Sequence, residues 1–142
     1  MKVTIVTPSY NQGKFIKRTI DSVLSQGVDD LEYIVMDGGS NDETVDILKS
    51  YGDKLIWKSE KDKGQTDAVN KGIRASHGDI IGWLNSDDIY YPGAVKKVLE
   101  VFETRPEVNV VYGNAYHIAE DDSIIEEYYT EDFDYERLKD IC

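Results

Sequence analysis

Hydrophobic and polar residues alternate along this chain in patterns that switch between strand and helix. Short apolar runs predict β-strands at residues 2–7, 32–36, 55–57, 79–84 and 108–112. Between these runs, apolar residues recur every three or four positions and predict helices over about 13–26, 41–51, 66–76 and 92–105. Strands that alternate with helices indicate parallel βαβ units. We therefore expect an α/β fold, a three-layer α/β/α sandwich with a mainly parallel sheet.

Local signals refine the ends of these elements. Ser40 and Glu43 have the spacing of a capping box, and Pro92 suits the first turn of a helix. Farther along the chain, residues 116–119 and 124–129 flank a polar stretch and predict a C-terminal β-hairpin. We therefore expect an α/β domain over residues 1–115, followed by a hairpin and an acidic tail over residues 116–142.

Length and composition narrow the class of protein. A chain of 142 residues suits one domain with one core, and 40% hydrophobic with 31% charged residues is typical of a soluble globular protein. No apolar run approaches the roughly 20 residues that span a bilayer, and the first residues lack the pattern of a signal peptide. A lone cysteine, Cys142, leaves no disulfide framework and favours a cytoplasmic location.

The net charge of −12 is unevenly distributed, because residues 120–142 contain 10 acidic and 2 basic residues. An acidic chain repels phosphate backbones, which argues against a nucleic-acid partner. A small phosphorylated ligand is still compatible with this charge when a divalent cation bridges it to carboxylates.

Candidate chemistry lies where three of the predicted strands end. Polar loops follow the first, second and fourth strands, at residues 7–11, 37–42 and 85–88. In a parallel sheet these loops converge on one edge. Each loop taken alone is also explained as a turn with a helix cap, but carboxylates gathered at one edge repel one another unless a cation lies among them. The sequence therefore predicts that Asp37 and Asp87 meet at one rim that binds a divalent ion.

Several of these side chains have two interpretations. Asp87 and Asp88 are hard oxygen ligands on a short turn, which suits Mn²⁺ or Mg²⁺. Alternatively, Asp88 caps the helix that begins near Pro92, and Asp87 is solvated. Asp37 can accept a hydrogen bond from a nucleobase N–H or from its own turn. Tyr10 can stack on a base or pack over the first helix.

Four segments of the chain, residues 3–11, 32–44, 64–72 and 78–88, resemble the family 2 inverting glycosyltransferases in their order and spacing. They read VTIVTPSYN, EYIVMDGGSNDET, GQTDAVNKG and GDIIGWLNSDD. The resemblance covers about residues 1–115. It implies the A-type nucleotide-diphospho-sugar transferase fold, with a Rossmann-like sheet.

The resemblance also implies roles for individual residues. The family's D-x-D motif falls on residues 85–87, where Asn85 replaces the first aspartate and removes one negative charge. By that match Asp87 is the carboxylate that binds a Mn²⁺ or Mg²⁺ ion, and its neighbour Asp88 is the second candidate ligand from the acidic pair. The nucleotide-sugar would contact Pro8, Ser9, Tyr10, Asp37, Lys63, Gly64, Asn85 and Ser86.

The activity implied by the resemblance is metal-dependent transfer of a sugar from a nucleoside-diphosphate-sugar, with UDP-sugars favoured, to a glycan or lipid-linked acceptor. Such a reaction belongs to polysaccharide or cell-envelope biosynthesis, at the inner face of the membrane or free in the cytoplasm. The family's catalytic base lies in the acceptor half, so we expect this chain to be the donor-binding half and assign no base. Residues 130–132, Thr-Glu-Asp, are similar to a triplet of related polymer-forming synthases, but they follow Asp87 by only about forty residues and lie on an acidic segment.

Other functions remain open at this point. The main alternative is a non-catalytic nucleotide-sugar-binding or interaction module. A nucleotidyltransferase needs a glycine-rich loop with an arginine after the first strand, and a phospho-accepting receiver domain needs an acidic pair there. Residues 7–13, TPSYNQG, provide neither feature. A homo-oligomer is a further expectation.

Overall fold

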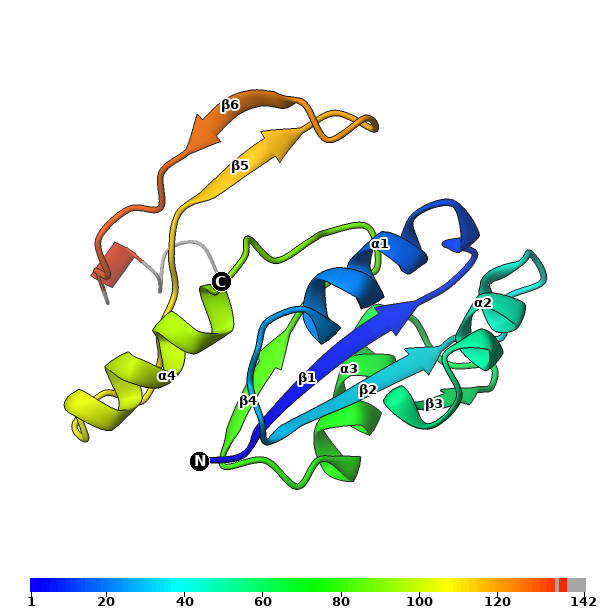
Figure 1. The fold of residues 1–142 in the computed structure, drawn as a ribbon, viewed down its shortest axis with the longest axis horizontal. Helices are drawn as coiled ribbons and strands as arrows, with labels where there is room; N and C mark the ends of the chain where they lie inside the picture. The colour runs from blue at the N-terminus through cyan, green and yellow to red at the C-terminus, as the bar shows by residue number, and fades with distance from the viewer. Residues whose placement is uncertain (135, 138–142) are drawn as a thin grey trace. The chain divides into compact units, whose positions relative to one another are not determined.

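The computed structural model describes residues 1–134, 136 and 137, and the chain divides into two compact units, Met1–Thr104 and Arg105–Cys142. The first unit contains a four-stranded sheet in the order β3-β2-β1-β4 (Figure 1). All three strand pairings are parallel. The strands are β1 (Val3–Ser9), β2 (Leu31–Asp37), β3 (Ile56–Ser59) and β4 (Ile80–Trp83).

Helices cover both faces of this sheet. The helices are α1 (Gly13–Leu24), α2 (Thr44–Ser50), α3 (Gln65–Ala75) and α4 (Ala94–Thr104), and a short 3₁₀ helix, η1 (Gly52–Lys54), follows α2. Because successive strand residues point to opposite faces, β1 and β2 bury one set of side chains against α1 and α2 and another against α3. In Figure 1, α1 and α3 lie on opposite sides of the sheet. The predicted three-layer sandwich with a mainly parallel sheet is therefore confirmed.

The larger core lies between the sheet and α1. Ile16, Ile20 and Val23 of α1 are fully buried against Ile5 and Val35 of the sheet. The spacing of these α1 residues is that of one helical face, as the sequence predicted. On the opposite face, Ile34 and Met36 pack with Ala68 of α3.

Two helix starts differ from the prediction. The helix α2 begins at Thr44, and the Ser40 hydroxyl donates to Asp37 instead of accepting from the helix, so the predicted capping box is wrong. The helix α4 begins at Ala94, two residues after Pro92. Its first turn is held by Gln26, whose Oε1 accepts a hydrogen bond from the Val95 N–H at 3.0 Å. The side chain of Gln26, distant in sequence, therefore satisfies an N–H group at the start of α4, where a local capping residue was expected.

The second unit contains the predicted hairpin, formed by β5 (Ala115–Ile118) and β6 (Ile124–Tyr128) in antiparallel pairing. The strand predicted over 108–112 is not formed. Val110 and Tyr112 are exposed there, and an apolar run without a neighbouring strand has no ladder to join. The tail predicted to reach Cys142 lies partly outside the described residues. The functional boundary near residue 115 stays a prediction.

Candidate functional site

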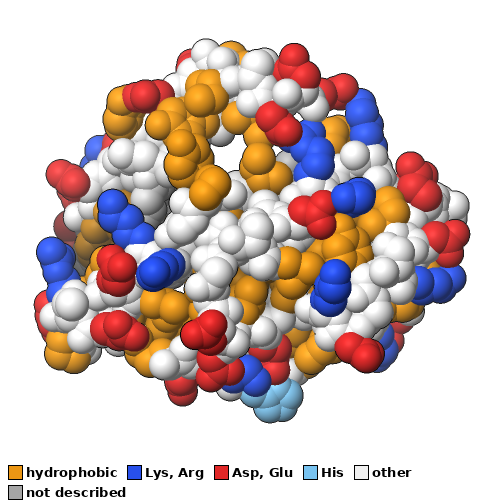
Figure 2. Space-filling view, viewed as in Figure 1, with side chains coloured by type: hydrophobic (Ala, Val, Ile, Leu, Met, Phe, Trp, Pro, Cys, Tyr) orange, Lys and Arg blue, Asp and Glu red, His pale blue; other side chains and the backbone are white. Residues whose placement is uncertain are grey.

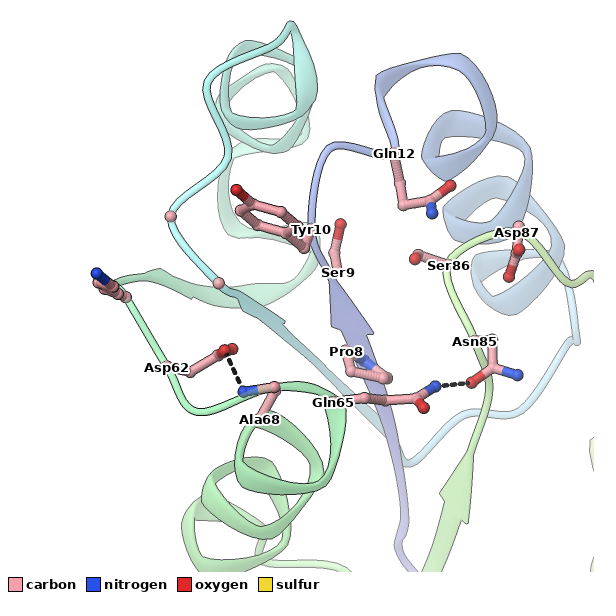
Figure 3. A pocket seen from close by; sticks show the side chains of 14 residues that line it. Pro8, Ser9, Tyr10, Gln12, Asp62, Gln65, Ala68, Asn85, Ser86 and Asp87 are labelled. Atoms are coloured by element: carbon pink, nitrogen blue, oxygen red, sulfur yellow. Dashed lines mark hydrogen bonds between the residues drawn. The ribbon is translucent and has the colours of Figure 1, made fainter.

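The topology creates a cleft at the carboxyl edge of the sheet. The chain moves outward from β1 to β2 and β3 and then crosses back to place β4 on the other side of β1. Ligands of open parallel sheets bind where the strand order reverses in this way. A cleft of about 800 Å³ lies there, a volume typical of small-molecule sites (Figure 3). It is lined by Pro8, Ser9, Tyr10, Gln12, Gly38, Gly39, Lys61, Asp62, Gly64, Gln65, Ala68, Asn85, Ser86 and Asp87.

Hydrogen bonds tie the loop after β1 to the loop after β2. The amide N–H groups of Gln12 and Gly13, at the start of α1, donate to Thr44 Oγ1 and Asp42 Oδ2 at 3.0 and 2.9 Å. Burial raises the pKa of Asp42, but hydrogen bonds, including those from Thr44 and Gly13, outweigh it and hold the pKa below its usual value. The carboxylate thus satisfies a helix N-terminus from a neighbouring loop. The wall of the cleft is therefore braced before any ligand binds.

The Asp37 carboxylate is turned into its own loop. It is 2% exposed and accepts hydrogen bonds from the backbone of Gly39 and Ser40 and from the hydroxyls of Ser40 and Ser59. Asp37 does not line the cleft, although the following residue, Gly38, does. The structure therefore supports the interpretation of Asp37 as a turn residue, and its contact with a nucleobase stays a prediction.

Ser9 and Tyr10, which follow Pro8 at the end of β1, offer contacts to a ligand. Tyr10 is 60% exposed, so its ring is not buried over α1 and lies at the cleft (Figure 3). Ser9 is 5% exposed, yet its hydroxyl makes no hydrogen bond with any described part of the chain. A buried hydroxyl without a partner is costly, and such groups commonly await a ligand or water. Both residues suit the nucleotide-contact role that the sequence predicted.

Asp62, in the loop after β3, contributes a second carboxylate to the cleft. Its Oδ1 accepts from the Gly64 N–H at 2.8 Å, and Oδ2 lies 2.9 Å from where a β-carbon on Gly38 would be. Lys61 and Gly64 also line the cleft. Lys63, predicted to contact the nucleotide, is exposed and does not line it.

The turn after β4 separates the two candidate metal ligands. Asp87 lines the cleft, and no hydrogen bond or ion pair engages its carboxylate within the described residues. Asp88 does not line the cleft, and its Oδ2 accepts from Asn85 Nδ2 at 3.0 Å. Since α4 begins only at Ala94, with Gln26 at its first turn, Asp88 does not cap this helix. The geometry leaves Asp87 as the carboxylate available to a ligand.

Within residues 1–134, 136 and 137, no group of three or more His, Cys, Asp or Glu side chains is positioned to hold a metal ion. One free carboxylate beside an open cleft instead fits Mg²⁺-type binding, in which one or two carboxylates share the ion with ligand phosphates and water. Among the same residues, no helix has the length and apolar character to cross a membrane.

The sequence model of Glycosyl transferase family 2 matches residues 4–140 of the chain. The chain belongs to this family. The match runs through both compact units and includes every residue that lines the cleft. It confirms the resemblance inferred from the four segments.

Curated relatives carry glycosyltransferase names. The chain is 33% identical over 121 residues to an uncharacterized glycosyltransferase of Rickettsia prowazekii, covering 85% of this chain and 38% of the relative. It is 35% identical over 126 residues to the chondroitin synthase of Escherichia coli, covering 87% of this chain and 18% of that protein. The chain thus spans well under half the length of these relatives.

Solved structures share the fold. Staphylococcus aureus TarS in complex with UDP-GlcNAc matches with a TM-score of 0.68 at 24% identity, over 75% of this chain and 32% of that one. The mannosyltransferase PcManGT from Pyrobaculum calidifontis, in complex with GDP-Man and Mn²⁺, matches with a TM-score of 0.67 at 23% identity, over 80% of this chain and 34% of that one. These likenesses confirm the predicted transferase fold.

Sequence reasoning left several cleft residues out. Gln12, Gly38, Gly39, Gln65 and Ala68 line the cleft but carry no charge and were not assigned as ligand contacts. Gly38 and Gly39 belong to the predicted loop 37–42, and Gln65 and Ala68 belong to segment 64–72, so the sequence marked their neighbourhood but not their individual roles. Gln12 lies outside these segments and required the three-dimensional arrangement.

Proposed function

We propose that the cleft binds a nucleoside-diphosphate-sugar, with a UDP-sugar favoured, and that the protein transfers its sugar to a glycan or lipid-linked acceptor. The observation that carries this proposal is the juxtaposition, at the switch point beside β1, of an unpartnered buried Ser9 hydroxyl, an exposed Tyr10 ring and a free Asp87 carboxylate. The complexes of UDP-GlcNAc with TarS and of GDP-Man with PcManGT support it, as does the family.

One end of the cleft would bind the nucleoside of the ligand, and the other end would bind its phosphates. Tyr10 would stack on the base, with Ser9 and Asp62 supplying polar contacts to the nucleoside. The N-terminus of α3, beginning at Gln65 after Gly64, offers backbone N–H groups toward a phosphate, and Lys61 adds a positive charge. Together these groups favour an anionic ligand over the acidic background of the chain.

A divalent cation fits at Asp87, whose carboxylate faces the cleft unengaged. Bound there, the ion would neutralise the diphosphate and stabilise it as a leaving group. Asp87 would hold the ion and the α3 N-terminus would orient the phosphates. The acceptor oxygen would bond to the anomeric carbon as the bond from that carbon to the diphosphate breaks, and the hydroxyl proton would pass to a general base. We assign no residue of this chain as the general base, since Glu131 is paired with Arg137 at 2.5 Å within the second unit.

The test is thermal unfolding of the protein with UDP, GDP, Mn²⁺ and their combinations. A ligand at about 100 times its dissociation constant adds about 2.7 kcal/mol to the free energy of unfolding, enough to raise Tm by several degrees. Asp87→Asn should abolish the Mn²⁺-dependent part of the shift. Asp53→Asn, an exposed aspartate on η1, is the matched control and should respond like the wild type. A folded wild-type protein that no nucleoside diphosphate stabilises with Mn²⁺ would overturn the proposal.

Binding alone does not distinguish a transferase from a non-catalytic donor-binding module. Slow hydrolysis of the nucleotide-sugar, in which water takes the place of the unknown acceptor, distinguishes a transferase from a binding module. Turnover of UDP-sugar that disappears in Asp87→Asn supports the transferase. Tight binding with no hydrolysis, by this chain and by a longer protein that contains it, favours the module.

A further inference from the structure

Asn85, which replaces the first aspartate of the family motif, is held between two side chains from different elements. Its Oδ1 accepts a hydrogen bond from Gln65 Nε2 at 2.8 Å, drawn in Figure 3, and its Nδ2 donates to Asp88 Oδ2 at 3.0 Å. Gln65 is the first residue of α3, and Asp88 lies on the turn after β4. The amide thus bridges the start of a helix and the turn that carries Asp87.

The chemistry of the three groups fixes the orientation of each one. An ionised carboxylate only accepts hydrogen bonds, so Asp88 must face the NH₂ of Asn85. The Asn85 carbonyl therefore faces Gln65, which must in turn present its own NH₂. An aspartate at residue 85 would place a second carboxylate about 3 Å from Asp88, where like charges repel.

The turn is held from its other side as well. Thr19 of α1 donates its hydroxyl to the carbonyl oxygen of Ser86 at 2.8 Å, in a buried contact. Asp87 is therefore the free residue of a turn whose neighbours, Asn85, Ser86 and Asp88, are each anchored. Anchored neighbours reduce the entropy that Asp87 would lose on binding a ligand.

We infer that Gln65 and Asn85 are positioning residues: their hydrogen-bond relay to Asp88 holds the turn so that, of the two carboxylates on this turn, only Asp87 is presented to the cation of the donor. This inference rests on the proposed function, in which Asp87 binds a divalent ion with a diphosphate. The relay also explains why Asn85 stands where the family motif has an aspartate, because an asparagine side chain supplies both a hydrogen-bond donor and an acceptor. Restoring the family's aspartate should therefore impair the site.

The experiment measures the dissociation constant of UDP with and without Mn²⁺ by titration calorimetry, and the ratio of the two is the readout. Asn85→Asp should reduce the gain from Mn²⁺, expressed as this ratio, by about tenfold. The exchange variant, Asn85→Asp with Asp88→Asn, restores one donor and one acceptor at the same net charge as the wild type. It should recover the gain to within about threefold.

A second set of variants tests the helix end of the relay. Gln65→Ala and Asn85→Ala should each reduce the gain from Mn²⁺, and the double variant should lose no more than the larger single loss, because both break one relay. Asn109→Asp, an exposed change in the second unit with the same added charge as Asn85→Asp, should leave the gain unchanged.

The outcomes separate the relay from the proposed function. If Asn85→Asp binds UDP with Mn²⁺ as tightly as the wild type, or the exchange variant fails to recover, the relay is wrong. If the wild type shows no gain from Mn²⁺ with either UDP or GDP, the proposed function fails. In that case the relay is judged by the metal-free Tm, which Asn85→Asp should lower and the exchange variant should restore.

Discussion

The carboxylate of Asp62 occupies the space in which a side chain at residue 38 would lie. A β-carbon on Gly38 would be 2.9 Å from Asp62 Oδ2, closer than such atoms approach without a shift. Both residues line the cleft, and they come from the loops after β2 and β3. The absence of a side chain at Gly38 therefore determines where the Asp62 carboxylate points.

The first prediction is that Gly38→Ala weakens nucleotide binding by displacing Asp62. A hydrogen bond to a charged group is worth about 1.5–3 kcal/mol, so the dissociation constant for UDP should rise roughly 10- to 100-fold. Asp62→Ala should give a similar loss, and the two changes together should not add. Calorimetric titration of the three variants checks this. Additive losses would show that the methyl group acts on the nucleotide without Asp62.

The second prediction concerns Tyr10, whose ring is largely exposed. Tyr10→Ala should leave the free energy of unfolding within about 0.5 kcal/mol, because no core contact is lost. It should weaken UDP binding by the about 1–3 kcal/mol typical of base stacking on an aromatic ring. Tyr10→Phe keeps the ring and should bind within about twofold of the wild type. Equal losses in both variants would point to the hydroxyl rather than to stacking.

The sequence predicted the parts of this fold that depend on local periodicity. The buried face of α1 and the β1–β2 pair follow from apolar spacing alone, and the loops after the strands mark the site because parallel strands end together. Helix ends were harder to predict because distant groups satisfy them. Gln26 holds the start of α4 across 69 residues, and Asp42 caps α1 from the loop after β2.

The orientation of the site side chains was also beyond sequence reasoning. Asp37 and Asp87 look equivalent in the sequence as loop aspartates. The Asp37 carboxylate nevertheless accepts four hydrogen bonds, whereas among the described residues none engages the Asp87 carboxylate. The strand predicted over 108–112 is wrong for a related reason. A β-branched run forms a strand only where another backbone pairs with it.

The third prediction tests the close packing of α3 on the sheet. A β-carbon on Gly72 would lie 2.4 Å from Cγ1 of Val6, which is completely buried. Alanine is favoured over glycine in a helix by about 1 kcal/mol, but overpacking a core costs about 1–3 kcal/mol. Gly72→Ala should therefore lower stability, as measured by urea unfolding.

The compensating variant makes this prediction specific. Val6→Ala removes the atoms that the new methyl group would meet, so Gly72→Ala should be less destabilising in the Val6→Ala background than in the wild type. Equal effects in the two backgrounds would show that the helix accommodates the methyl group without contacting Val6.

The fourth prediction follows from Glu32, a carboxylate that is 8% exposed at the end of the sheet opposite the cleft. Burial raises its pKa, but hydrogen bonds from the His77 backbone, Thr4, Lys2 and the His77 ring outweigh this and lower the pKa from 4.5 to about 2. A carboxylate with a depressed pKa stabilises the fold above its unfolded pKa. This contribution should be complete above about pH 5 and should be lost as the pH falls toward 2.

Replacing the carboxylate isolates this effect. Glu32→Gln removes the charge that Lys2 and His77 face and should cost about 2 kcal/mol at pH 7, the typical value of hydrogen bonds to a charged group. The difference in unfolding free energy between wild type and variant should shrink as the pH falls from about 5 to about 2, because Glu32 takes up its proton in the unfolded chain first and in the folded chain only near pH 2. Urea unfolding at each pH measures it, with the exposed Glu103→Gln as control. A difference that stays constant down to pH 2 would mean that shape rather than charge makes Glu32 stabilising.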